Sequence, residues 1–177
     1  APAQLNYEKW LIGNPFEVAR SADSTKILFI AKYPTKLKEP AKYKLTVVNN
    51  DMSEFYSTDV DFPVHTKWMT YNGALVDNYG NVHVLVTEKM SKDEQKEKGK
   101  NGIFADKYEA ELYSYYHEDK KLIHYDLESN LHDKVVQNIT LQQSDNGEIL
   151  GVGFYSDRVF WGQGYSGFYT MRIDPKT

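Results

Sequence analysis

Hydrophobic and polar residues alternate along much of the chain, or the hydrophobic ones form short uninterrupted runs, and both patterns are typical of β-strands. Clusters of Asp, Asn, Gly and Ser separate these segments and favour tight turns, because they tolerate positive φ angles or bond to the turn backbone. The pattern therefore predicts an all-β fold of antiparallel strands. The predicted strands cover residues 16–21, 27–31, 43–47, 54–60, 69–76, 82–86, 108–116, 122–127, 135–143, 149–155 and 167–174.

The predicted strands recur three times in one order. Each unit has a mixed strand, a tight turn with Asp, an apolar strand, a longer loop, an alternating aromatic strand, a polar turn and a last short strand, which the third unit lacks. The apolar second strands start at Ile27, Val82 and Ile149, and the units differ mainly in loop length. A four-stranded antiparallel unit of this size is typical of one blade of a β-propeller. We therefore expect a single β domain over residues 1–177 that forms a partial propeller, with blades at approximately 13–62, 66–130 and 131–177.

A closed eight-stranded barrel of the lipocalin type is the alternative architecture. The length of 177 residues suits such a barrel. Lipocalins usually carry a Gly-x-Trp sequence near the N-terminus, whereas Glu8 and Lys9 precede Trp10. The count of eleven predicted strands and the repeat also favour blades.

The order of turns and loops predicts where a binding site lies. In antiparallel blades, the short turns gather at one face and every long loop falls at the other, and binding usually resides on loops held by a rigid scaffold. The loop after the tenth strand is rich in aromatic residues and glycine, so its rings can stack on sugars or anchor a protein. Alternatively, two of these rings, Phe160 and Trp161, pack onto the neighbouring blade. The predicted ligand-binding residues are Arg158, Phe160, Trp161 and Tyr165.

The sequence offers no recognised catalytic or metal-binding motif. Cysteine is absent, which excludes disulfides, thiol nucleophiles and cysteine zinc sites. No two histidines have the helical or same-strand spacing of metal ligands, so we predict neither a metal site nor a cofactor. The Asp residues of the turns, at 23, 77 and 145, are interpreted as turn formers. The histidines are His65, His83, His117, His124 and His132, and the acidic residues near the ends of fourth strands are Asp59, Asp61, Asp126 and Glu128.

Those four acidic residues occupy equivalent positions in successive blades, far from a central channel. We therefore interpret them as an effect of the repeat and not as the carboxylate pair of a glycosidase. No catalytic residue is predicted, and we expect a protein that is not an enzyme.

Composition narrows the class of partner. A net charge of −4 argues against binding to nucleic acid. No run of 18 apolar residues is present, so no membrane span is expected. The 14 Tyr, 8 Phe and 3 Trp fit half-buried strand surfaces, which agrees with the all-β prediction.

The third unit resembles a known group of proteins. Residues 145–157 and 167–174 are similar to the blade repeats of large, uncharacterised, exported propeller-like proteins of Gram-negative bacteria, and the resemblance covers about 131–177. It implies a periplasmic, cell-surface or secreted location and supplies no catalytic residue.

We therefore expect a non-enzymatic binding or scaffolding module of the cell envelope that makes contacts through its long-loop face. Its partner is expected to be a protein or a glycan, with edge-to-edge self-association or further blades as additional contacts. The alternatives are a fragment of a carbohydrate-active propeller enzyme and a small-ligand-binding barrel.

Overall fold

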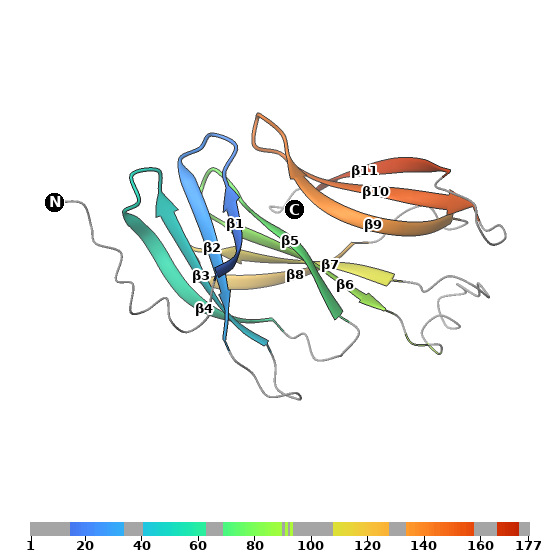
Figure 1. The fold of residues 1–177 in the computed structure, drawn as a ribbon, viewed down its shortest axis with the longest axis horizontal. Helices are drawn as coiled ribbons and strands as arrows, with labels where there is room; N and C mark the ends of the chain where they lie inside the picture. Colours follow the sequence, from blue (N-terminus) through green and yellow to red (C-terminus); the bar gives the residue numbers. More distant parts are fainter. Residues whose placement is uncertain are drawn as a thin grey trace.

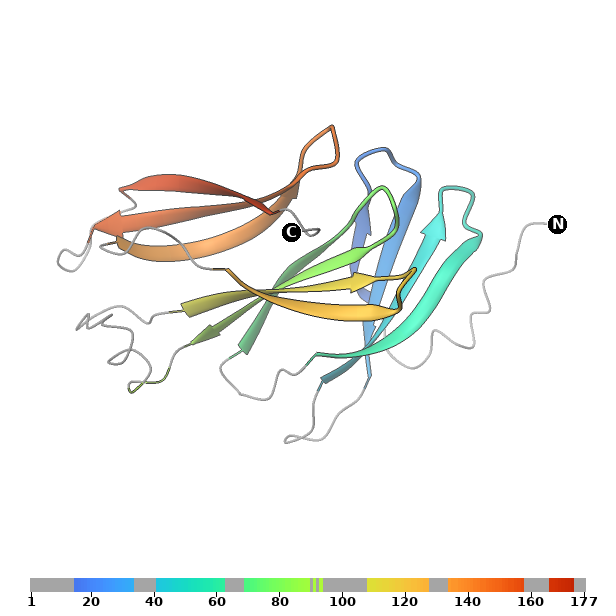
Figure 2. The same cartoon turned by 180° about the vertical axis from the view of Figure 1, so that it is seen from behind.

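The computed structural model describes residues 15–33, 41–62, 69–89, 91, 93, 108–127, 134–157 and 166–173. These residues form eleven strands in three separate antiparallel sheets (Figure 1; Figure 2). The prediction of an all-β partial propeller of antiparallel blades is confirmed. The described strands do not close into the eight-stranded barrel that was the alternative.

Each sheet is a meander in which strands that follow one another in the chain also lie side by side. The first sheet consists of β1 (Pro15–Arg20), β2 (Lys26–Lys32), β3 (Ala41–Asn49) and β4 (Glu54–Phe62). The second consists of β5 (Met69–Val76), β6 (Val82–Lys89), β7 (Tyr108–Tyr116) and β8 (Lys121–Leu127). The third consists of β9 (Lys134–Gln143), β10 (Ile149–Asp157) and β11 (Gly167–Ile173).

The tight hairpins share one turn geometry. Between β3 and β4 the amide of Asn49 donates to the carbonyl of Ser53, and the amide of Met52 donates to the carbonyl of Asn49, both at 2.9 Å. The hairpins at 77–81 and 144–148 repeat this pair of bonds. The fourth turn residue has a positive φ in all three: 67° at Met52, 91° at Gly80 and 85° at Gly147. Only the two glycines adopt this left-handed conformation without a steric cost.

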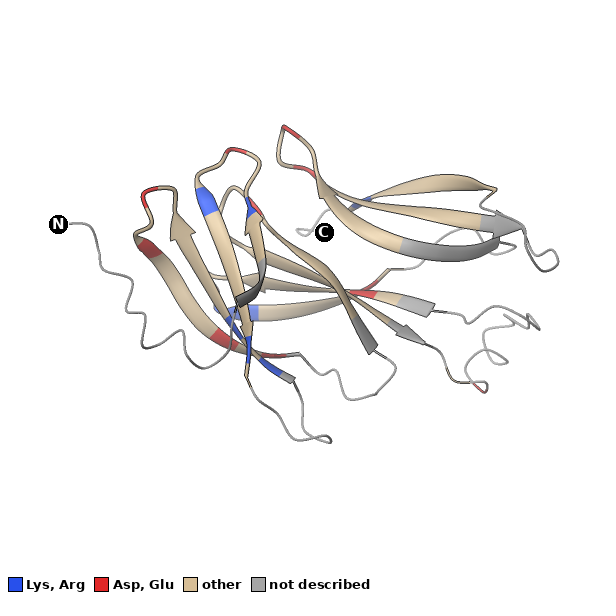
Figure 3. Ribbon diagram, in the orientation of Figure 1, with Lys and Arg blue, Asp and Glu red and all other residues tan. Residues whose placement is uncertain are grey.

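Acidic and amide side chains accept hydrogen bonds from the backbone of the tight turns, as the sequence predicted for Asp23, between β1 and β2, and for Asp77, between β5 and β6. Oδ1 of Asp23 accepts a hydrogen bond from the amide of Thr25, and Oδ1 of Asp77 accepts one from the amide of Tyr79, each at 2.9 Å. In the third sheet, Asn146 instead of Asp145 accepts from the turn, through the amide of Glu148 at 3.4 Å. Figure 3 shows acidic residues at the tips of these hairpins.

Two apolar clusters join the three sheets. The first lies between the first and second sheets and includes Leu28, Ile30 and Val84; the second lies between the second and third sheets and includes Leu85 and Ile149. We call the side of a sheet that points to the next sheet in the chain its following face, and the opposite side its preceding face. The second sheet is covered on both faces, which is why β6 is an almost continuous apolar run instead of an alternating one.

The hairpins of the three sheets also meet at one end of the molecule. The side chain of Asn78 accepts a hydrogen bond from the amide of Asp23 at 3.1 Å. On its other side Asn78 lies against Gly147, where an added Cβ atom would come within 2.9 Å of the amide nitrogen. The Tyr56 hydroxyl donates to the carbonyl of Gly80 at 2.7 Å. One turn of the second sheet therefore holds the turns of both neighbours.

The shared turn geometry predicts that Met52→Gly stabilises the protein. Relief of the left-handed strain at this exposed residue should raise the free energy of unfolding by about 0.5–1 kcal/mol. Urea denaturation measures the difference. Gly147→Ala is the opposite test, because it places a side chain at positive φ against Asn78, and it should lower the free energy of unfolding. Equal effects of the two variants would contradict the assigned geometry.

Candidate functional site

The sequence-predicted contact residues Arg158, Phe160, Trp161 and Tyr165 lie outside the described residues. The strands on either side of them are described, and the amide of Ser166 donates to the carbonyl of Tyr155 at 2.9 Å where the two strands part. The described strand ends that flank residues 34–40, 90–107 and 158–165 lie opposite the tight turns of their sheets. This confirms the predicted division into a short-turn end and a long-loop end.

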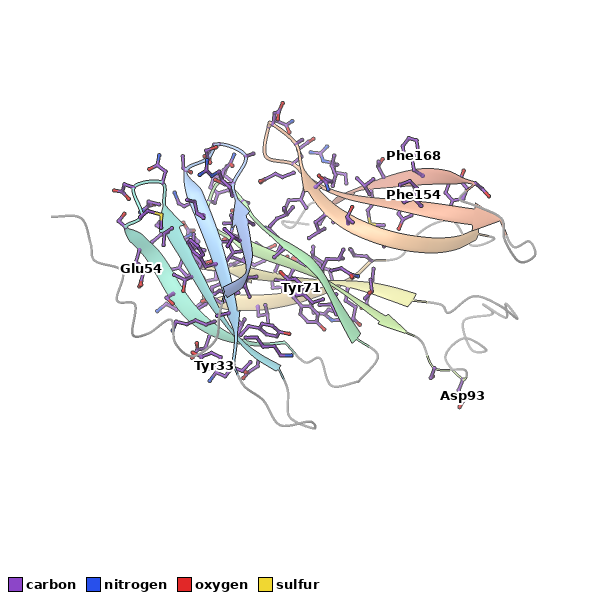
Figure 4. The ribbon with its side chains drawn as sticks, viewed as in Figure 1. Tyr33, Glu54, Tyr71, Asp93, Phe154 and Phe168 are labelled. Carbon is purple, nitrogen blue, oxygen red and sulfur yellow. The ribbon has the colours of Figure 1, made fainter. Side chains whose placement is uncertain are left out.

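Two exposed aromatic side chains lie near this loop connection. Phe154 of β10 and Phe168 of β11 are directly opposite one another across the strands, one residue pair from the long-loop end. They are 41% and 70% exposed. Both belong to the following face of the third sheet, and Figure 4 shows Phe168 projecting away from the other two sheets. These two residues were not predicted from the sequence, because the prediction rested on the loop residues and not on the strand ends.

The rest of this face mixes apolar and polar side chains. Leu150 and Val152 lie on the same side of β10 as Phe154 and are partly buried. At the short-turn end the guanidinium of Arg172 forms an ion pair with Glu148 at 2.7 Å. The exposed aromatic pair therefore continues an apolar row along the middle strand of the sheet.

A second aromatic group lies at the short-turn end of the first two sheets. The ring of His117 stacks on Tyr56, with centroids 5.2 Å apart, and meets the edge of Phe55 at 5.0 Å. The ammonium of Lys26 lies 4.8 Å from the centre of the Phe55 ring. Tyr79, in the turn at 77–81, is exposed. Most of these side chains contact a neighbouring hairpin, so we interpret the group as a structural contact that joins the first two sheets.

An Asp–His–Ser set lies inside the second sheet. Nδ1 of His83 is 2.8 Å from Oγ of Ser114, its direct partner across β6 and β7. Nε2 of His83 lies 3.4 Å from Oδ2 of Asp77 in the preceding turn. His83 and Ser114 are fully buried and Asp77 is nearly so. His83 is therefore a hydrogen-bonded residue of the blade interior.

Residue types alone make this set look like a hydrolase triad, but its surroundings do not suit that chemistry. A nucleophilic serine must reach a substrate, and Ser114 has no exposed surface. Burial alone would raise the pKa of Asp77, but hydrogen bonds from His83 and Asn81 outweigh it and lower that pKa below its ordinary value. The set therefore satisfies buried polar groups and stabilises the sheet.

A different cluster combines a histidine with two carboxylates at an accessible position. Glu111 of β7 faces Asp126 of β8, and the adjacent pair on the same side is Tyr113 with His124. Nε2 of His124 lies 3.5 Å from Oε2 of Glu111 and 3.3 Å from Oδ1 of Asp126. One ligand atom from each of these three residues lies within 4.8 Å of the others. This cluster was not predicted from the sequence, because the prediction about metal sites rested on the spacing between histidines and left out the carboxylates.

The remaining carboxylates singled out from the sequence have different surroundings. Asp59 accepts a hydrogen bond from Tyr33 at 2.7 Å and pairs with the ammonium groups of Lys42 and Lys44 at 3.7 and 3.9 Å. Burial, followed by this contact with Asp59, raises the pKa of Tyr33 to about 12. Asp61 is exposed, and Glu128 lies outside the described residues.

No family model matches the chain, and no curated protein matches it. Among the residues that the structure describes, no helix has the length and apolar character needed to cross a membrane.

The buried polar set predicts a cost for removing one hydroxyl. Ser114→Ala leaves a ring nitrogen of His83 without its partner and should lower the free energy of unfolding by about 1–3 kcal/mol. Thr170→Ala, at an exposed strand position, is the control and should change it by a few tenths of a kcal/mol. Chemical denaturation measures both. A Ser114→Ala protein as stable as the control would show that the buried contact contributes nothing.

The lowered pKa of Asp77 predicts a pH-dependent stability. Because ionised Asp77 is favoured in the folded state, its contribution is complete above about pH 4 and is lost as the pH falls through the lowered folded pKa. Asp77→Asn should therefore be less stable than the wild type at neutral pH, and the gap should narrow in acid. Unfolding curves collected from pH 7 to acid measure the gap. Asp119→Asn, an exposed turn residue, is the control, and a gap that does not change with pH would contradict the prediction.

Proposed function

We propose that the chain is a non-enzymatic binding and scaffolding module of the cell envelope, and that its outer sheets assemble with a second copy of the chain. One observation carries this proposal: the following face of the third sheet occupies the same place in the repeat as two interfaces already present within the chain.

The correspondence is seen at the fourth position of the second strand of each sheet. Ile30, Leu85 and Val152 are each the fourth residue from the aligned strand starts and lie on the following face. Ile30 and Leu85 are fully buried by the next sheet. Val152 remains partly exposed beside Phe154 and Phe168. Contiguous exposed apolar side chains mark protein contacts more often than isolated ones do.

The chain also carries a matching surface for that face. On the preceding face of the first sheet, Val18 is exposed and Ile27 and Phe29 are partly buried. In the two internal interfaces, a following face of one sheet packs on a preceding face of the next. Two copies joined in the same head-to-tail way contain six sheets, a number within the about four to eight of closed propellers.

The non-enzymatic part of the proposal is supported by the burial of Ser114 and His83, which withholds that serine from any substrate. The location in the periplasm, at the cell surface or outside the cell is supported by the resemblance of residues 131–177 to exported propeller-like proteins. The loop residues Arg158, Phe160, Trp161 and Tyr165 stay predicted contacts for a further protein or glycan.

Self-association measured by sedimentation velocity tests the assembly. The wild type should form dimers as its concentration rises, and Phe168→Lys should weaken the association at least about tenfold, because it places a charge in the contact. Val18→Lys should do the same, since it lies on the opposite half of a head-to-tail contact.

Tyr79→Lys is the matched control, because Tyr79 is 69% exposed, close to the 70% of Phe168, but lies at the short-turn end. It should leave the association unchanged. A wild type that stays monomeric overturns the proposal. So does an association that Val18→Lys does not weaken, which would indicate a symmetric contact through Phe168 alone.

A further inference from the structure

We propose that Glu111, His124 and Asp126 form a binding site for a first-row divalent transition-metal ion such as Zn²⁺. This site is independent of the proposed assembly, because it lies on the second sheet and involves neither outer face.

The hairpin between β7 and β8 places the three ligands on one side of two adjacent strands. Glu111 and Asp126 are direct cross-strand partners, and His124 is two residues before Asp126, so its side chain points to the same side. All three positions therefore depend on one hairpin register and not on loop conformations. A site built on paired strands holds its ligands more precisely than a site built on loops.

Two of the three separations between ligand atoms match those of a metal centre. With metal–ligand bonds of about 2.1 Å, two ligand atoms in a tetrahedral site lie about 3.4 Å apart. Nε2 of His124 lies 3.5 Å from the Glu111 oxygen and 3.3 Å from the Asp126 oxygen. The third separation, between the two carboxylate oxygens, is within 4.8 Å. The Asp126 side chain is 76% exposed, so it has room to rotate and shorten this separation when an ion binds.

Tyr113 holds two of the three ligands in place. Its hydroxyl donates a hydrogen bond to Oε2 of Glu111 at 2.9 Å, and its ring stacks on the imidazole of His124 with centroids 4.8 Å apart and planes 17° from parallel. Such second contacts fix the direction of a ligand before the ion arrives. Tyr113 is thus a positioning residue for the site.

The chemistry of the ligands selects the class of ion. Two carboxylates close together repel one another, and a cation between them relieves that repulsion. An imidazole nitrogen suits Zn²⁺ and other first-row transition ions, whereas Ca²⁺ and Mg²⁺ prefer oxygen ligands only. With three protein ligands and partial exposure, one coordination position stays open to water or to a group from another molecule.

Titration calorimetry with ZnCl₂ on the full chain tests the site, and Co²⁺ serves as a second probe because its visible absorption reports the ligand geometry. We expect one Zn²⁺ per chain at this site, and we expect the visible absorption of bound Co²⁺ to indicate a low coordination number. His124→Gln and Asp126→Asn should each abolish the stoichiometric binding. Tyr113→Phe should weaken it by roughly tenfold, as loss of a second contact does, and Ca²⁺ should not compete.

Each control variant makes the same chemical change as one of the test variants, at a position away from the site. Asp61→Asn removes an exposed strand carboxylate elsewhere, and His117→Gln removes a histidine at the short-turn end; both should bind Zn²⁺ like the wild type. Circular dichroism of each variant confirms that it is folded. Zn²⁺ binding that survives His124→Gln, or that Asp61→Asn reduces as much as Asp126→Asn does, overturns the proposal, as does a wild type that binds no Zn²⁺.

Discussion

The structure depends on the packing of neighbouring sheets against one another through apolar faces, and the second sheet has such a face on each of its two sides. A lone antiparallel sheet with two apolar faces is not stable in water, because one sheet can bury neither face by itself. Here the second sheet resolves this by lying between the other two, with Val84 directed to one neighbour and Leu85 to the other. The buried polar set of Asp77, His83 and Ser114 fits the same environment only because each member finds a partner inside it.

The short-turn end adds direction to this packing. Apolar faces alone allow two sheets to slide. The hydrogen bond that Asn78 accepts from the amide of Asp23 and the one that Tyr56 donates to the carbonyl of Gly80 fix the relative height of the first and second sheets. The turn residues therefore act both within a hairpin and between hairpins. Glycine at position 147 serves the two purposes together, since it provides a positive φ and leaves room for Asn78.

The sequence predicted the strands well and the side-chain clusters poorly, and the difference is physical. Strand limits follow from local alternation and turn chemistry, and the predicted starts at Val82 and Ile149 are those observed. Clusters across a hairpin obey another rule, since the numbers of paired residues have a constant sum instead of a constant spacing. Glu111 with Asp126 and Tyr113 with His124 belong to one such series. A search for fixed spacings within one strand cannot find them, although the predicted hairpin contained the information.

The row of sheets also determines how the molecule tolerates change. Each sheet is made of local hairpins, and the long-range contacts of the fold lie between neighbouring sheets, so the domain behaves as a short one-dimensional array with nearest-neighbour coupling. Loss of an outer sheet removes one coupling, whereas loss of the middle sheet removes both. Duplication or deletion of a blade at the end of such an array therefore alters its length while every remaining interface stays intact, which is the route by which repeat proteins lengthen and shorten during evolution.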